Sequence, residues 1–189
     1  RVGALPTAQL RIVQVLDRSN RQPAADQELA DALKKFPTNP EVLGFAAQRQ
    51  RAQGNPAKAA ELLQAMADRN PDNPMLLNDL TWAQVEAKLP DALKNASRAA
   101  ELAPNSPAIL DTLGIAQAQA GKQAEAIASL RIAVSLAPLQ AAARLHLAEL
   151  YLAAGDRKEA SRLLLPLEGK KLGSKEQETF KRLSNGVTG

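Results

Sequence analysis

Residues 107–138 read PAILDTLGIAQAQAGKQAEAIASLRIAVSLAP, two apolar segments joined at a glycine. Pro107 opens the first segment, a position at which a helix loses nothing from the missing N–H of proline. Gly121 follows that segment and suits the positive φ at which many helices end. Three residues of the second segment recur at helical spacing and share one face: Ala126, Leu130 and Ala133. The stretch therefore predicts a helix, a short turn and a second helix.

The same pattern recurs along the chain every 33 or 34 residues. A proline marks the end of successive units: Pro37, Pro71, Pro104 and Pro138. An alanine column runs in step with these prolines: Ala25, Ala59, Ala92, Ala126 and Ala160. Small residues fill the matching position of the upstream helix: Ala47, Thr81, Gly114 and Ala148. Such a period predicts stacked helix pairs, because one pair alone cannot bury its apolar face.

The repeats predict an all-α fold with a single array over residues 1–189. The expected repeats are 6–39, 40–73, 74–106, 107–140 and 141–173, followed by a capping helix over 174–184. Ser174 and Gln177 form a candidate capping box at the start of that helix, and Gly186 is its candidate end. In the third repeat, Lys88-Leu-Pro-Asp91 replaces the usual glycine turn.

Composition agrees with an all-α class. The chain has 37 Ala and 29 Leu among 189 residues, with one Trp, one Tyr and three Phe. A β-sandwich or barrel would need more β-branched and aromatic residues. The absence of cysteine excludes disulfides and thiolate metal sites. No apolar run approaches the roughly 18 residues that a membrane-spanning helix requires.

The positive charge is confined to the end of the chain. Residues 1–156 hold 16 basic and 16 acidic side chains, whereas residues 157–189 hold 8 basic and 4 acidic ones. A nucleic-acid-binding protein should carry a basic stripe on its main face, so this class is disfavoured. The basic tail flanks two apolar residues at helical spacing, Phe180 and Leu183. We expect a charged cap on the last repeat, with an anionic lipid surface or acidic polymer as the alternative ligand.

Candidate catalytic residues are few. His146 and Glu149 lie three apart on a predicted helix and could share a metal ion, but a catalytic zinc site needs a third protein ligand. A Ser-His-acid triad would depend on the same single histidine. The glycines terminate helices and form no phosphate-binding loop. We therefore expect no catalytic, cofactor or metal site, and a protein that is not an enzyme.

The 34-residue helix–turn–helix resembles the tetratricopeptide repeat (TPR) family over about residues 6–167. The unit from Pro107 through Gly114 and Gly121 to Pro138 is the most similar. The first unit departs from the family pattern, with Asn20 where glycine is usual. Leucines replace the family's early aromatic residue: Leu43, Leu77 and Leu110. The resemblance implies an α-solenoid of about five repeats that binds protein partners.

In the TPR family, one face of the first helices lines a concave groove. The resemblance places seven residues on this face as candidate partner-binding residues: Gln14, Gln48, Asn78, Trp82, Asp111, Ile115 and Glu149. The amides suit hydrogen bonds to an extended peptide, and Trp82 and Ile115 suit apolar contacts. Two interpretations of Trp82 stay open, packing between adjacent first helices or anchoring a bound segment.

A narrower resemblance concerns the cellular setting. Leu77-Asn-Asp-Leu-Thr-Trp82, Pro90-Asp-Ala-Leu93 and Ala108-Ile-Leu-Asp-Thr-Leu-Gly114 follow in an order similar to the C-terminal end of TPR lipoproteins of exosortase/PEP-CTERM and exopolysaccharide systems. This resemblance implies a bacterial envelope protein in the periplasm, with a cytoplasmic location as the alternative. Its partners would be polysaccharide-system components.

Three hypotheses follow about function. The first is a non-catalytic scaffold that binds a partner segment on the concave face. The second is direct binding of an anionic polysaccharide or membrane surface through the array and the basic tail. The third is a spacer in a longer solenoid: the chain begins at Arg1, so we expect a fragment with an exposed apolar face on its first helix pair.

Overall fold

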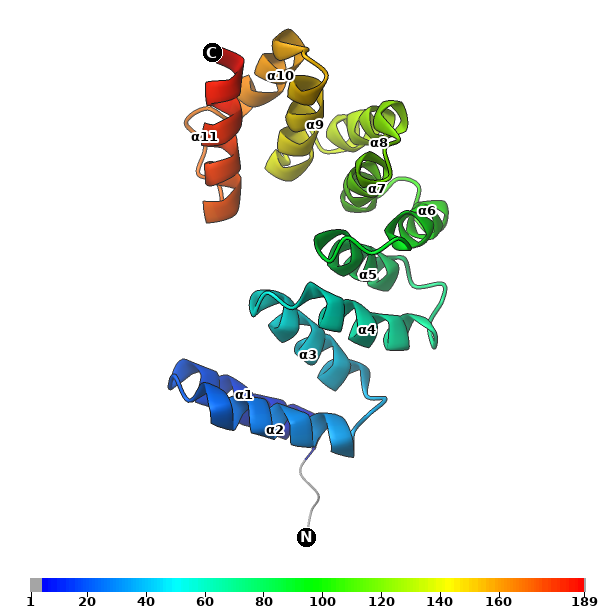
Figure 1. Ribbon diagram of the computed structural model, residues 1–189, viewed down its shortest axis with the longest axis vertical. Coiled ribbons are helices and arrows are strands. Elements are labelled where there is room, and N and C mark those ends of the chain that lie inside the picture. Colours follow the sequence, from blue (N-terminus) through cyan, green and yellow to red (C-terminus); the bar gives the residue numbers. More distant parts are fainter. Residues whose placement is uncertain (1–4, 189) are drawn as a thin grey trace. The chain divides into compact units, whose positions relative to one another are not determined.

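The computed structural model describes residues 5–188, and this part of the chain contains helices and no strand. Figure 1 shows the helices in chain order. Their bounds are α1 (Pro6–Arg18), α2 (Gln22–Lys35), α3 (Pro40–Ala52), α4 (Pro56–Ala67), α5 (Pro74–Glu86), α6 (Ala92–Leu102), α7 (Pro107–Gln119), α8 (Gln123–Leu136), α9 (Ala141–Ala153), α10 (Arg157–Leu164), the 3₁₀-helix η1 (Leu165–Leu167) and α11 (Ser174–Thr188). The predicted all-α class is confirmed.

The chain divides into two compact units, Arg1–Leu89 with α1 to α5 and Pro90–Gly189 with α6 to α11. The boundary falls inside the third expected repeat, 74–106, whose two helices belong to different units. Each unit is therefore described by itself. The single array over 1–189 stays a prediction.

In the first unit, helix pairs pack through small and branched residues. The α1–α2 pair buries Val13 against Ala25 and Leu29, and Val42 and Ala46 of α3 join the same cluster. At the other side of α1, Leu5, Ile12 and Val15 are exposed by 68%, 48% and 60%. These three residues therefore form an exposed apolar stripe. The residue that matches Ile12 in the next repeat, Ala46, is fully buried.

In the second unit, α7 and α8 pack most closely at Gly114. A Cβ atom at Gly114 would lie 2.5 Å from Cγ of Leu130 and 3.2 Å from the carbonyl oxygen of Ala126. Any larger residue would separate the two helices. Further along, α9, α10, η1 and α11 share one core that includes Ala148, Ala160 and Leu183. The close approach explains why the repeat requires small residues at both columns.

One type of turn joins the two helices in all five predicted repeats. A residue with positive φ ends each first helix: Asn20, Gly54, Lys88, Gly121 and Gly155. The next N–H then donates to the carbonyl five residues earlier, as from Asn55 to Gln50 at 2.8 Å and from Leu89 to Gln84 at 2.9 Å. These bonds form Schellman motifs, which satisfy the free carbonyls of a helix end. Lys88 thus adopts the glycine conformation at φ 55° in the unusual third turn.

The last helix differs from its sequence-based expectation at both ends. It continues to Thr188 instead of ending near residue 184. A Cβ atom at Gly186 would lie 3.4 Å from Leu152, so this glycine permits close packing on α9 and does not stop the helix. At the start, the carboxylate of Glu176 accepts a hydrogen bond from the N–H of Gly173 at 3.0 Å, in place of the expected Ser174–Gln177 box.

Candidate functional site

A groove of about 520 Å³ in the first unit brings together two of the predicted binding residues. Gln14 of α1 and Gln48 of α3 both line it, and both side chains are exposed. They occupy the same position of successive repeats, 34 residues apart. Phe45, which is half-buried, supplies an apolar surface beside these amides. The groove therefore combines hydrogen-bonding groups with one aromatic contact.

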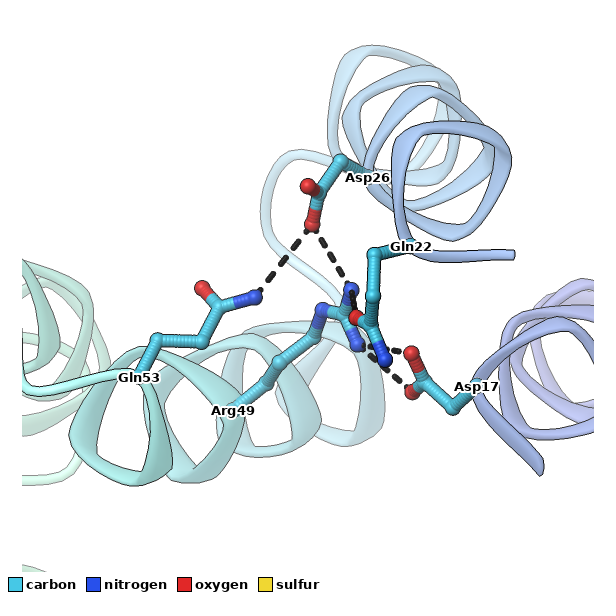
Figure 2. A network of polar contacts seen from close by, with 5 residues as sticks. All are labelled: Asp17, Gln22, Asp26, Arg49 and Gln53. Carbon is cyan, nitrogen blue, oxygen red and sulfur yellow. Dashed lines mark hydrogen bonds and ion pairs between the residues drawn. The ribbon is translucent and has the colours of Figure 1, made fainter. Parts of the chain in front are cut away.

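A polar network around Arg49 forms part of the wall of the groove (Figure 2). The guanidinium Nη1 donates to both carboxylate oxygens of Asp17, at 2.6 Å for Oδ2. Its Nη2 donates to Asp26 at 2.7 Å and to Gln22 at 3.1 Å. Gln53 also donates to Asp26, at 3.4 Å. One arginine of α3 thereby ties α1 to the start of α2.

The network shifts the pKa values of Asp26 and Arg49. Hydrogen bonding from Arg49 lowers the pKa of Asp26. Burial of the Arg49 guanidinium opposes its charge, but hydrogen bonds to Asp26 and Asp17 outweigh this effect and raise its pKa. The Arg49 side chain is only 9% exposed, while Asp17 and Asp26 are 29% and 57% exposed. The wall of the groove thus contains one guanidinium that is paired with two carboxylates.

The sequence analysis did not identify Arg49, although the repeats contain a signal. The matching residues of the other four repeats are apolar: Val15, Ala83, Ala116 and Leu150. Ala83 and Ala116 are buried. An arginine in an apolar column breaks the local pattern, and such breaks are expected at functional or strained sites. The partners of Arg49 lie 23 to 32 residues away and have no signal of their own.

The two other predicted binding residues of the first unit lie on α5. Asn78 is 7% exposed, and its side-chain oxygen has no hydrogen-bond partner in residues 5–188. Burial raises the pKa of the neighbouring Asp79, and the side chain of Asn78 opposes this rise. Trp82 is half-buried, which leaves both interpretations of this side chain open.

The predicted binding residues of the second unit are in part already paired. Oδ1 of Asp111, on α7, lies 2.8 Å from Nδ1 of His146 on α9. Glu149 accepts a hydrogen bond from Arg182 of α11 at 2.7 Å. Within residues 5–188, no three His, Asp or Glu side chains lie together in an arrangement that could hold a metal ion. Ile115 is half-buried on α7.

The apolar content of the helices bears on membranes as well. None of the helices within residues 5–188 is long and apolar enough to cross a bilayer.

Sequence comparison finds a TPR-containing relative. Over 127 residues, 66% of this chain, the sequence is 30% identical to the TPR repeat-containing protein PA4667 of Pseudomonas aeruginosa. The matched region is 22% of that protein, so the chain spans about a fifth of the length of this curated relative. No family model matches the chain.

Structural comparison finds solved chains with a similar fold, one of them a TPR protein. TTC0263, a thermophilic TPR protein of Thermus thermophilus, shares 26% identity at a TM-score of 0.71, covering 97% of this chain and 100% of its own. PilW, a type IV pilus biogenesis factor, is 18% identical at a TM-score of 0.74, covering 97% of this chain and 86% of its own, and shows the fold alone. The relative and the structural neighbours together support the tetratricopeptide repeat family for this chain.

Proposed function

We propose that the chain is a non-catalytic scaffold that binds an extended segment of a partner protein, with the groove of the first unit as its principal surface. The observation that carries this proposal is the pairing of Gln14 and Gln48 beside Phe45 in one groove. Side-chain amides can donate to and accept from a peptide backbone, and an aromatic ring can hold one apolar side chain of the segment.

The Arg49 network supports this function by holding the groove in shape. A surface that is already ordered loses less conformational entropy when it binds. Arg18, Arg49 and Asp17 line the groove, and Asp26 pairs with Arg49 from outside the lining, so these four charges sum to zero. A neutral, partly apolar segment fits these properties better than a highly charged one.

The matching positions of the later repeats add further contacts in this proposal. Trp82 and Ile115 contribute half-buried apolar surface, and Asn78, which is largely buried, would have to turn its amide outward to bind a partner. Asp111 and Glu149 act through their existing pairs with His146 and Arg182. Binding would then be distributed over several repeats, with no single deep pocket.

We infer the cellular setting from the narrower sequence resemblance. It favours a bacterial envelope or exopolysaccharide assembly system, in the periplasm, with components of that system as the partners. The segment 77–82 and the turn at Pro90 carry this inference.

The proposal is tested by photo-cross-linking in the source cells followed by titration. A photoreactive residue at Gln48 should capture a partner that is not captured from Lys58, an exposed residue of α4 outside the groove. The captured protein is then titrated against wild-type chain and two double variants. Gln14→Ala/Gln48→Ala should weaken binding by roughly tenfold, about the effect of losing two hydrogen bonds.

The matched control is Gln27→Ala/Gln64→Ala, which removes two exposed glutamines of the second helices. It should change the dissociation constant by less than about twofold. Equal weakening by both double variants would contradict the groove assignment. The same titration with Asn78→Ala/Trp82→Ala tests the contribution of α5, and unchanged binding would remove α5 from the surface.

A second candidate is the direct binding of an anionic polysaccharide or membrane surface. Four lysines of the C-terminal region form no ion pair within the described chain: Lys170, Lys171, Lys175 and Lys181. This mode predicts binding that falls steeply with salt and is lost when Lys170, Lys171 and Lys175 are neutralised. Salt-insensitive binding of the polymer or vesicle would exclude it.

A further inference from the structure

A separate pocket of about 300 Å³ lies in the second unit, between the turn after α8, the start of α9 and the loop after η1. All of its charged lining residues are cations: Arg144, Lys170 and Lys171. Its apolar lining includes the buried Leu167, the half-buried Leu172 and Leu139, which is 83% exposed. The pocket thus joins an apolar floor to a positively charged rim.

Arg144 interrupts a column of leucines in the repeat. The matching residues of the three preceding repeats, Leu43, Leu77 and Leu110, are at most 7% exposed. Packing alone would favour a fourth leucine, because burying a guanidinium costs free energy that an aliphatic side chain does not. The arginine therefore needs another explanation, and the pocket that it lines offers one.

The structure holds the Arg144 guanidinium in place but leaves its charge uncompensated. It donates to the carbonyl oxygen of Pro138 and, at 3.4 Å, to that of Leu163. Neither Arg144 nor Lys170 or Lys171 forms an ion pair anywhere in residues 5–188. Three cations without an acid among the lining residues make a site for a negative group. A guanidinium that is already oriented suits a carboxylate, which it can bind through two parallel hydrogen bonds.

We propose that this pocket binds a protein segment in which an apolar side chain adjoins a carboxylate. This inference rests on the proposed function as a protein-binding scaffold and assigns it a second, acidic-apolar specificity. The carboxylate pairs with Arg144 and the two lysines, while the apolar side chain packs on Leu167 and Leu172.

Two other anionic ligands fit the pocket less well. A uronic-acid polymer carries carboxylates, but its hydroxyl groups would lose hydrogen bonds to water against a floor of leucine and proline. A bilayer surface is flat on this scale and would contact the exposed lysines without entering a hollow lined by the half-buried Arg144. The combination of an enclosed apolar floor and a charged rim favours a side chain of a peptide.

The experiment uses a short synthetic peptide of alternating leucine and glutamate, blocked at both ends, added to the full chain. Chemical-shift changes of the backbone amides of Leu139 and Leu172 report binding at the pocket. Arg144→Leu should weaken binding roughly tenfold, the effect of one charge-assisted hydrogen-bonded pair. It restores the leucine of the three preceding repeats, so the melting temperature should be retained. Because both Lys170 and Lys171 are exposed, Lys170→Gln/Lys171→Gln tests the same rim with little effect on folding.

Three controls decide between the alternatives. Lys175→Gln/Lys181→Gln removes the same charge outside the pocket and should leave binding unchanged within about twofold. A peptide with glutamine for glutamate, and one with serine for leucine, should each bind at least about fivefold more weakly. Equal binding of either peptide, or equal losses from the two lysine double variants, would overturn the proposal.

Two further measurements distinguish the classes of ligand and the two proposed binding sites. If an alginate oligomer or a phosphatidylglycerol vesicle shifts the same amides at lower concentration than the peptide, with the same dependence on Arg144, the pocket is not a peptide site. Gln14→Ala/Gln48→Ala should leave peptide binding here unaffected. A failure of this inference is therefore distinguishable from a failure of the groove in the first unit.

Discussion

Two places in the molecule, the arginines of α3 in the first unit and Gly114 of α7 in the second, hold neighbouring helices together by different means. In the first unit, charged groups link the first helices: Arg49 binds Asp17 of α1, and Arg51 of α3 binds both carboxylate oxygens of Glu86 of α5 at 2.8 and 2.9 Å. In the second unit, α7 and α8 meet without a side chain between them at Gly114. In the same type of repeat, neighbouring helices can thus be held together by ion pairs or by close packing at a small residue.

The comparison is sharpest for two arginines. Arg49 and Arg144 each replace an apolar residue of a repeat column, and both are largely covered by protein. Two carboxylates compensate Arg49, whereas Arg144 has only backbone carbonyls as partners. A compensated arginine builds structure, while an uncompensated one retains charge for a ligand. The predictions below test this contrast together with the packing and the turns of the two units.

The largest effect is expected at the glycines. Gly114→Ala should destabilise the second unit by about 1–3 kcal/mol, because its Cβ would overlap Leu130 and force α7 and α8 apart. Native-state hydrogen exchange of amides in α7 and α8 measures this loss. The matched change is Gly44→Ala in α3, whose Cβ would meet only Met66 at 3.9 Å. It should stabilise the first unit by about 0.5–1 kcal/mol, since alanine favours the helix.

The next effect separates the two arginines. Arg49→Met should destabilise the first unit by about 1–2 kcal/mol, a modest loss because Asp17 and Asp26 are partly exposed and regain water. Arg144→Leu should leave the free energy of unfolding unchanged or raise it. Chemical denaturation of both variants is the measurement. A similar loss from both changes would show that Arg144 is structural too.

A pH series sharpens the assignment to the ion pairs. The pKa of Asp26 is lowered from its ordinary value of 3.8, chiefly by the hydrogen bond from Arg49. Its stabilising contribution is therefore complete above about pH 4 and is lost as the pH falls through the folded-state pKa. The stability difference between wild type and Arg49→Met should be constant from neutral pH to about pH 4 and shrink below it. A difference that persists at lower pH would assign the effect to packing.

The smallest effects are expected at the turns. Lys88→Gly should stabilise the chain by about 0.5–1 kcal/mol, because lysine pays a steric cost at φ 55° that exceeds the added freedom of glycine when unfolded. Asn20→Gly should gain only about a few tenths of a kcal/mol, since asparagine tolerates this conformation. Thermal unfolding of the two variants gives the comparison. Destabilisation by Lys88→Gly would imply that the lysine side chain has a role of its own.

The helices could be predicted because their limits are local signals. Proline stands at or next to the start of several helices, and a residue of positive φ follows each first helix, even where Lys88 replaces glycine. Gly186 misled the prediction because glycine serves two purposes. It ends helices, and it also permits close packing, as it does here on Leu152. Which of these two roles Gly186 has can be decided only from the position of α9.

The candidate sites were less predictable because their contacts connect residues far apart in sequence. Gln14 and Gln48 came from their repeat position, and the structure places both in one groove. The pairing of Asp111 with His146 over 35 residues has no local signal. Arg49 and Arg144 have one, the interruption of an apolar column, but it does not say which arginine finds carboxylates. That depends on side chains of neighbouring helices.

Hydrogen–deuterium exchange of the chain, with and without the partner captured from Gln48, tests the proposed groove most directly. Binding in the groove should slow exchange in α1 around Gln14 and in α3 around Gln48. Exchange in α2 and α4 should stay unchanged apart from the start of α2 at Gln22. Slowed exchange confined to the outer surfaces of α2 and α4, with α1 and α3 unaffected, would contradict it.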